Sequence, residues 1–116
     1  MRPDLRAAPF HLDDAGLAWV EQTLSAMTPR QRAGHLFIHS SMGADPGEAA
    51  RLAALEPAGI TRFFTDDMGH ELALMDQIRA ASPVPLLVSA DLEGSRMSLP
   101  FGTEAPNPLA LAAVHD

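Results

Sequence analysis

Two acidic residues, Asp91 and Glu93, stand two positions apart directly after a short apolar run. Because side chains alternate along an extended strand, both carboxylates would project from the same face. A carboxylate pair can cleave a glycosidic bond when one group is the acid and the other the nucleophile or base, but the two must approach the sugar from different sides. Neighbours on one strand do so poorly, so we expect no catalytic residue in this pair. A solvated exit from the strand is the plainer interpretation of the two charges.

The apolar run before Asp91, Pro85-Leu86-Leu87-Val88, predicts the strand that would position these carboxylates. Near-continuous hydrophobic runs are typical of parallel strands that helices cover on both faces. In parallel α/β folds the loops after the carboxyl ends of the strands converge, and ligands bind there. Asp91 and Glu93 therefore fall where such a fold would carry a binding site.

Capping signals predict the helices of the chain. One of these signals, Thr28-Pro29-Arg30-Gln31, is a capping box with proline at the first helical position. In the helix expected over about 69–81, Leu72, Met75 and Ile78 share one face. The expected helices begin at Asp13 or Asp14, at Thr28, near Asp45, after Asp67 and at Pro108.

Two further strands are expected upstream of the run that precedes Asp91. The first is 36–38, and the second is 59–65, which is rich in β-branched and aromatic residues. Strands that alternate with helices through right-handed crossovers build a parallel sheet. The sequence therefore predicts the α/β class.

Three motifs, in matching order, resemble those of glycoside hydrolase family 3. Asp91-Leu92-Glu93-Gly94-Ser95-Arg96 is similar to the D-x-E-G-G-R segment of that family. The stretch 102–113 resembles its G-T-x-x-P-x-x-x-A-L-A-A run, and 27–37 resembles its M-T-x-x-x-K-I-G-Q-L-F opening. Ser95 departs from the pattern, because the family has a second glycine there. A serine at that position is strained if the backbone needs a positive φ.

The resemblance implies a fold, an activity and a site. The family folds as a (β/α)8 barrel and hydrolyses O-glycosyl bonds of β-linked glucosides or N-acetylglucosaminides with retention. Carried over, Asp91 is a substrate-binding carboxylate that accepts hydrogen bonds from sugar hydroxyls. Glu93 and Arg96 would pair with each other or support the loop. The family's nucleophile and acid/base lie on later segments, so the resemblance implies no catalytic residue and no glycosidase turnover in these residues alone.

Chain length limits how much of such a barrel is present. A (β/α)8 barrel takes about 250 residues, whereas this chain has 116 and signals for about three strands. We therefore expect a mobile leader over 1–12 and, over 13–116, a truncated N-terminal portion of the barrel, with its first three or so β/α units. The last strand would present an apolar edge open to self-association. The alternative is a free-standing small α/β binding or interaction module without catalysis.

The composition of the chain limits which classes of partner and site we expect. The net charge is −7 and the eight basic residues, all arginine, are scattered, which argues against nucleic acid or an anionic membrane as partner. Without cysteine there is no disulfide framework or thiolate metal site. No segment reaches the length of a membrane span, and the N-terminus lacks the apolar core of a signal peptide, so we expect a cytoplasmic protein.

Other motifs that suggest chemistry have simpler explanations. Thr65-Asp66-Asp67 resembles the family's S-D-D nucleophile motif, but it follows the second strand, and helix capping explains it better. His35 and His39 would bind a metal only if both lay on one helix face, and His39 is expected in or after a strand. The glycines at 43–47 lack the spacing of a phosphate loop. We therefore expect no metal and no cofactor.

Overall fold

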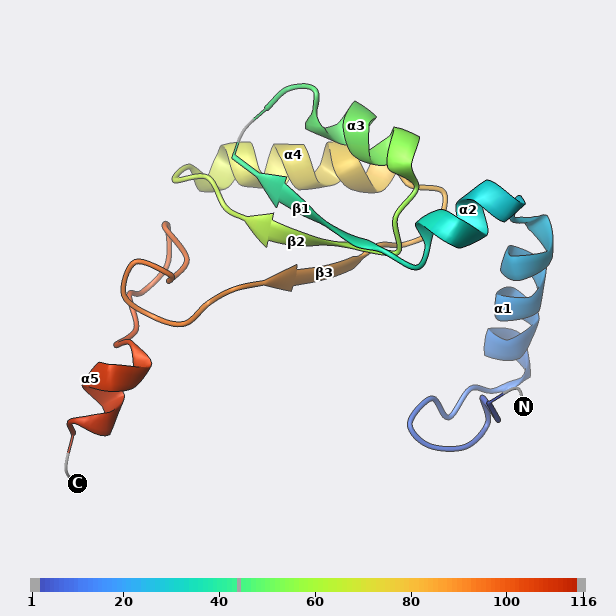
Figure 1. Cartoon of the computed structure of the whole chain (residues 1–116), viewed down its shortest axis with the longest axis horizontal. Helices are drawn as coiled ribbons and strands as arrows, with labels where there is room; N and C mark the ends of the chain where they lie inside the picture. The colour runs from blue at the N-terminus through green and yellow to red at the C-terminus, as the bar shows by residue number, and fades with distance from the viewer. Residues whose placement is uncertain (1–2, 44, 115–116) are drawn as a thin grey trace. The chain divides into compact units, whose positions relative to one another are not determined.

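The computed structural model describes residues 3–43 and 45–114. The chain divides into two compact units, Met1–Ala33 and Gly34–Asp116, and each is described by itself. Figure 1 shows the helices and strands along the chain.

The first unit is helical. Helix α1 (Asp14–Ala26) begins where predicted, because the Asp13 carboxylate accepts a hydrogen bond from the Gly16 amide at 2.8 Å. Residues 3–12 form turns ahead of it, and their mobility stays a prediction.

The predicted capping box is present at the start of α2 (Pro29–Gly34). The Thr28 amide donates to Gln31 Oε1 at 2.9 Å, and the Gln31 amide donates to Thr28 Oγ1 at 3.3 Å. This reciprocal pair satisfies two amide groups that the first helical turn leaves free, so the local sequence determines where the helix begins.

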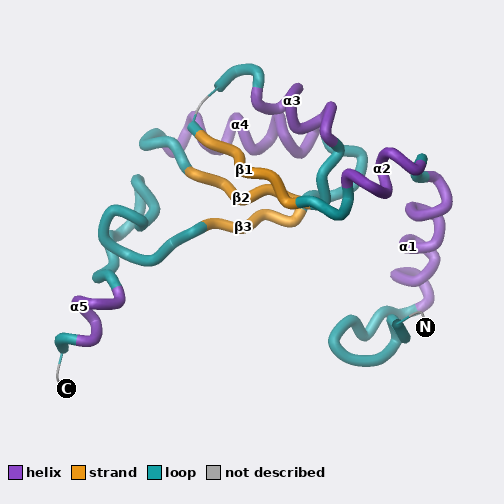
Figure 2. The backbone as a smooth tube through the Cα atoms, viewed as in Figure 1, coloured by secondary structure: helices purple, strands orange, loops and turns teal. Residues whose placement is uncertain are grey.

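The second unit is a parallel sheet with helices on one face, which confirms the α/β class. Strands β1 (Ile38–Met42), β2 (Gly59–Phe63) and β3 (Leu87–Ala90) lie in the order β1-β2-β3, and both pairings are parallel. Helix α3 (Glu48–Leu55) joins β1 to β2, and α4 (Met68–Ala81) joins β2 to β3. Figure 2 shows both helices on the same side of the sheet.

The core lies between this helix pair and β2. Ile60 of β2 is fully buried against Leu52 of α3 and a group of residues on α4. Strand alternation then directs Arg62 to the same face, where it is also buried. The buried α4 residues are Glu71, Leu74, Met75 and Ile78.

The first and third strands begin two residues later than predicted. Phe37 belongs to a turn, because its amide donates to the Gly34 carbonyl at 3.0 Å, and β1 consists of the more polar residues that follow. The third strand starts at Leu87, whose amide donates to the Ala58 carbonyl at 3.0 Å. Pro85 has no amide hydrogen to give to a ladder, so the run cannot pair from its first residue. The second strand ends at Phe63 rather than at residue 65.

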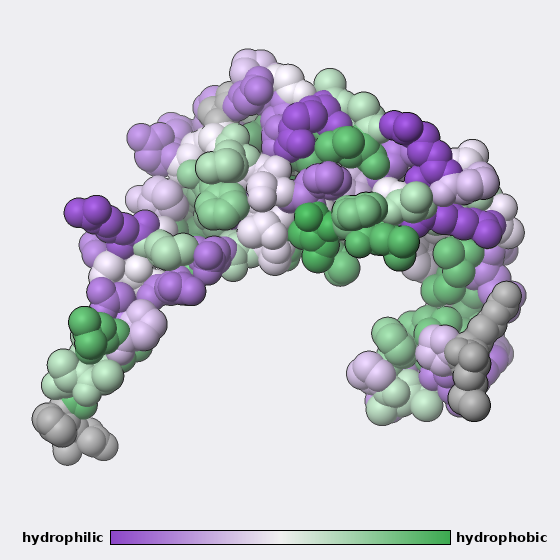
Figure 3. Space-filling view, in the orientation of Figure 1, coloured by the Kyte–Doolittle hydropathy of each residue, from purple (hydrophilic) through white to green (hydrophobic). Residues whose placement is uncertain are grey.

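The prediction that β3 is buried on both faces is wrong. All four of its residues are exposed, with Leu87 at 67%. The physical reason is that β3 is the last strand of the sheet, and the helices that join the strands, α3 and α4, both lie on the same face. The predicted apolar edge is therefore present, and Figure 3 shows hydrophobic residues gathered on the surface where β3 begins.

Two helix predictions need correction. The Asp45 carboxylate accepts from the Gly47 amide at 2.8 Å and closes a turn, so α3 begins only at Glu48, capped by Gly47 without a side-chain bond. On α4, Leu72 is exposed at 57%, because the buried face is set by the residues around Leu74. Asp67 does cap α4, as predicted, through the His70 amide at 2.6 Å.

The remaining helix, α5 (Pro108–Ala112), begins at the predicted proline, and Asn107 caps it through the Ala110 amide at 2.8 Å. Over 3–43 and 45–114, no helix combines the length and the apolar character that crossing a membrane requires.

Candidate functional site

Asp91 follows β3 directly, at the carboxyl edge of the sheet. Its side chain is exposed, and it lines an open pocket of about 160 Å³. No hydrogen bond or ion pair within the described residues engages its carboxylate. An exposed carboxylate without a protein partner keeps its acceptor positions available for the hydroxyl groups of a ligand. The other lining residues are Arg62, Phe63, Phe64, Leu92, Arg96, Met97, Ser98 and Pro100.

The loop after Asp91 is held by its backbone. The Ser95 amide donates to the Ala105 carbonyl at 2.6 Å, and Ser98 Oγ accepts from the Ala105 amide at 3.1 Å. Gly94 has φ +88°, and a Cβ there would overlap the Pro106 carbonyl. Glycine is therefore required at this position by both conformation and space.

Ser95 also has a left-handed backbone, with φ +48°. Strain was predicted at this serine if its backbone had a positive φ, and the observed φ meets that condition. A Cβ in this region costs about 1 kcal/mol, so the loop adopts its conformation against a local preference.

Glu93 and Arg96 do not form an ion pair in the part of the chain that the structure describes. Arg96 lines the pocket beside Asp91, whereas Glu93 is exposed. Of the two expected roles, pairing with each other is absent here, and support of the loop stays a prediction for both residues.

A buried ion pair, which was not predicted from the sequence, lies beneath this edge. Arg62 and Glu71 form a buried ion pair, with Nε to Oε1 at 2.7 Å and Nη2 to Oε2 at 2.8 Å. Burial pushes the pKa of Glu71 upward, but hydrogen bonds from Arg62 and Thr65 outweigh it, so the pKa lies below its usual value. The available signal was two opposite charges at positions whose spacing matches the core, Arg62 after Ile60 and Glu71 before Leu74.

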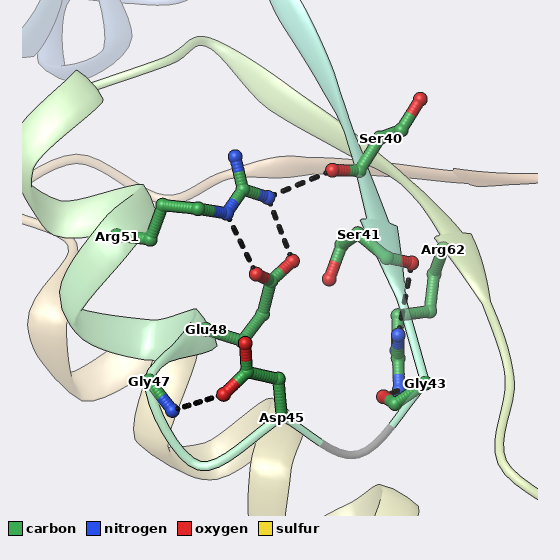
Figure 4. Close-up of polar contacts among 8 residues, drawn as sticks. All are labelled: Ser40, Ser41, Gly43, Asp45, Gly47, Glu48, Arg51 and Arg62. Carbon is green, nitrogen blue, oxygen red and sulfur yellow. Dashed lines mark hydrogen bonds and ion pairs between the residues drawn. The ribbon is translucent and has the colours of Figure 1, made fainter.

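A second ion pair, between Glu48 and Arg51, lies at the start of α3, on the side of β1 where Arg62 binds the Ser41 and Gly43 carbonyls (Figure 4). Arg51 donates two hydrogen bonds of 2.8 Å to the buried carboxylate of Glu48 and a third, of 2.9 Å, to the Ser40 carbonyl. The Arg51 bonds lower the pKa of Glu48 despite its burial. The Ser41 hydroxyl also lies toward this carboxylate and lowers the pKa, although it falls short of hydrogen-bond geometry.

The other sequence-predicted candidates have structural explanations. His39 lies in β1, as expected, and His35 Nδ1 lies 3.1 Å from the Glu56 carbonyl. Over 3–43 and 45–114, no group of three or more His, Cys, Asp or Glu residues could hold a metal ion. Thr65 and Asp67 are engaged in the turn that begins α4, with Thr65 Oγ1 donating to the Asp67 carbonyl at 3.0 Å.

Sequence comparison relates the chain to one curated protein. A beta-N-acetylglucosaminidase/beta-glucosidase of Cellulomonas fimi is 35% identical over 111 residues, which is 95% of this chain. The chain is similar to part of a glycosidase. It spans about a fifth of the length of that relative, 20%. No protein-family model matches the chain, and no solved structure does.

Proposed function

We propose that the chain forms the first three β/α units of a retaining β-glycosidase barrel of the family 3 type, with 13–116 as the barrel portion. The observation that carries this proposal is the combination of an open parallel sheet with 35% identity to about a fifth of a glycosidase. A sheet with an exposed apolar last strand is what the opening part of a (β/α)8 barrel would present before later strands pair with it.

In this proposal the role of the chain is to bind sugar. Asp91 stands at the carboxyl end of a parallel strand, where the ligands of such barrels bind. An ionised carboxylate accepts strong hydrogen bonds from neighbouring hydroxyls, and these tighten as the sugar ring distorts toward the transition state. The substrate class is β-linked glucosides or N-acetylglucosaminides, which the name of the Cellulomonas fimi relative supports.

Cleavage would require groups that these residues do not supply. A retaining enzyme needs an acid/base and a nucleophile about 5 Å apart on either side of the bond. Asp91 and Glu93 follow the same strand, and Glu93 does not line the pocket. Both catalytic groups are therefore assigned to segments outside this chain.

Sugar binding can be tested by nuclear magnetic resonance on the isotope-labelled chain. N-acetylglucosamine and glucose are titrated into the chain, its Asp91→Asn variant and an Asp76→Asn control, whose carboxylate is also exposed but lies on α4. We expect saturable shifts of the amides around Asp91 in the chain and the control, and their loss in Asp91→Asn. Shifts that are absent, or that persist in Asp91→Asn, would contradict the assignment.

One observation favours a second candidate, the free-standing module. All four residues of β3 are exposed, and within the described residues β3 pairs only with β2. Such an edge is a template for pairing with another strand. A monodisperse oligomer with a cooperative thermal transition would support a module that covers its edge with a second copy, whereas aggregation or a molten species would support the barrel portion.

A further inference from the structure

One side chain, Arg62, joins the ends of several elements at the carboxyl edge of the sheet. Its Nη1 donates to the Ser41 carbonyl at 2.9 Å, and its Nη2 donates to the Gly43 carbonyl at 2.6 Å. The Nε and Nη2 groups also hold the carboxylate of Glu71 in the first turn of α4. A single buried guanidinium therefore connects the end of β1, β2 and the start of α4. Figure 4 shows its bonds to Ser41 and Gly43.

Glu71 extends this network to the loop after β2. Its Oε2 accepts from the Thr65 amide at 3.2 Å, and Thr65 in turn donates from Oγ1 to the Asp67 carbonyl. The same ion pair thus holds Gly43, after β1, and Thr65, after β2. Both residues lie at the sheet edge that Asp91 follows, and Arg62 itself and Phe64, from the segment after β2, line the pocket of Asp91.

Packing does not replace these bonds at Gly43. The glycine has φ +63°, and a Cβ built there would meet no atom within 4 Å. Its backbone is instead held by two hydrogen bonds, from Arg62 to its carbonyl and from its amide to the Phe63 carbonyl at 3.3 Å. An open turn with so little packing would open easily without them.

Stability alone does not account for a buried charge pair at this place. Apolar residues of similar volume often serve a core as well as a buried ion pair or better, and Ile60, Leu74 and Ile78 already provide apolar surroundings. Apolar side chains cannot bind the carbonyls of Ser41 and Gly43, however. The function particular to Arg62 is therefore to hold backbone.

We propose that Arg62 is a positioning residue: it holds the backbone at the end of β1 directly and, through Glu71, fixes the segment after β2, whose Phe64 lines the pocket beside Asp91. The ligand in this statement rests on the proposed sugar-binding function. The positioning of the loops rests only on the hydrogen bonds of Arg62 and Glu71.

Amide hydrogen exchange on the full chain separates positioning from simple stabilisation. The variant Arg62→Met/Glu71→Leu keeps the core filled, and Arg62→Lys keeps the charge but cannot hold two carbonyls and a carboxylate in one fork. The informative probe is the Gly43 amide, because its own acceptor, the Phe63 carbonyl, is unchanged in both variants. The Ile60 amide reports opening of the core for comparison.

We expect the Gly43 amide to exchange about 30-fold faster in the double variant and about 5-fold faster in Arg62→Lys, each measured relative to Ile60. Equal changes at Gly43 and Ile60 in both variants would show that the pair is merely structural and overturn the proposal. Titration with N-acetylglucosamine adds a separate readout, for which we expect about tenfold weaker binding in the double variant. If the unaltered chain binds no sugar, the proposed function fails while the exchange result still decides the positioning role.

Discussion

The guanidinium of Arg62 on β2 and the carboxylate of Glu71 on α4 meet in two hydrogen bonds of 2.7 and 2.8 Å, and the arginine side chain is 0% exposed. Because both side chains are buried, removal of one would leave the charge of the other without solvation by water. The stability of the sheet unit therefore depends on the pair being complete, whatever its net contribution relative to an apolar core.

The first prediction concerns removal of one member of that pair. Arg62→Met should lower the free energy of unfolding by about 3–5 kcal/mol, because it leaves the Glu71 carboxylate buried and unpaired. Urea denaturation followed by circular dichroism measures the loss. The control is Arg79→Met, which breaks the exposed Arg79–Asp76 pair and should change stability by about 0.5 kcal/mol or less. Similar losses for both arginines would count against the structural role of the buried pair.

The second prediction is a pH dependence that follows from Glu48 and Glu71. The pKa of each carboxyl is lowered in the folded chain, so the folded state favours the ionised form. Their contribution to stability is fully present above the unfolded pKa of about 4.3 and is lost as the pH falls through the lower folded pKa. Urea midpoints between pH 7 and pH 3 should therefore decrease only toward the acid end.

The matched variant for this pH effect is Glu48→Gln. Its partner Arg51 is partly exposed, so the substitution leaves a solvated cation rather than a buried one. We expect a smaller decrease of the urea midpoint at acid pH than in the unaltered chain. An identical decrease of the urea midpoint at acid pH in both proteins would show that Glu48 does not contribute to the pH dependence of stability.

The third prediction concerns the loop after Asp91. Ser95→Gly should raise the free energy of unfolding by about 0.5 kcal/mol, because relief of the left-handed strain exceeds the extra chain entropy of glycine. Gly94→Ala should act in the opposite direction, since its methyl group would overlap the Pro106 carbonyl. Thermal denaturation of the two variants checks both signs, and a destabilised Ser95→Gly would show that the serine is favoured there.

The fourth prediction concerns the exposed edge of the sheet. Leu87→Lys should reduce self-association of the chain, because a charged side chain on an edge strand opposes pairing with a second strand. Sedimentation velocity over a concentration series measures the effect. Leu72→Lys on the exposed surface of α4 is the control, and an equal reduction in both variants would place the association elsewhere.

The fifth prediction is that the purified chain gives no measurable turnover. The proposed function places the nucleophile and the acid/base outside these residues, and no single carboxylate completes the retaining mechanism. A chromogenic β-glucoside and a chromogenic β-N-acetylglucosaminide serve as substrates. Steady hydrolysis that copurifies with the chain and responds to Asp91→Asn would contradict this assignment of roles.

Several helix caps whose deciding contact lies within four residues were predictable from the sequence, although the turn that Asp45 closes with Gly47 was not. The capping box at Thr28 and Gln31 and the cap of Asp67 on His70 involve neighbours in sequence, and both were predictable. The first residues of β1 and β3 were not predictable, because a strand begins where its backbone starts to pair with the neighbouring strand. The amide of Leu87 finds its acceptor at Ala58, far away in sequence.

The site shows the same division. Asp91 could be placed after a parallel strand from the apolar run alone, but Arg62 was hidden inside a stretch that looked like an ordinary strand. Its burial is possible only because the Glu71 carboxylate comes from the next helix and the Ser41 and Gly43 carbonyls come from the end of the preceding strand and the residue after it. The residue pattern within one strand or helix cannot reveal a contact that brings together β2, α4 and the end of β1.

The most direct test of the sugar-binding role is a replacement in the related glycosidase. The 111 residues of this chain that align with the Cellulomonas fimi protein take the place of their counterparts, with and without Asp91→Asn. Hydrolysis of chromogenic β-N-acetylglucosaminide and β-glucoside is then measured. We predict that the chimera hydrolyses at least one substrate and that Asp91→Asn lowers kcat/KM by about 100-fold, as expected for loss of a hydrogen bond to a charged group. A chimera whose kcat/KM is the same with aspartate or asparagine at position 91 would contradict the account.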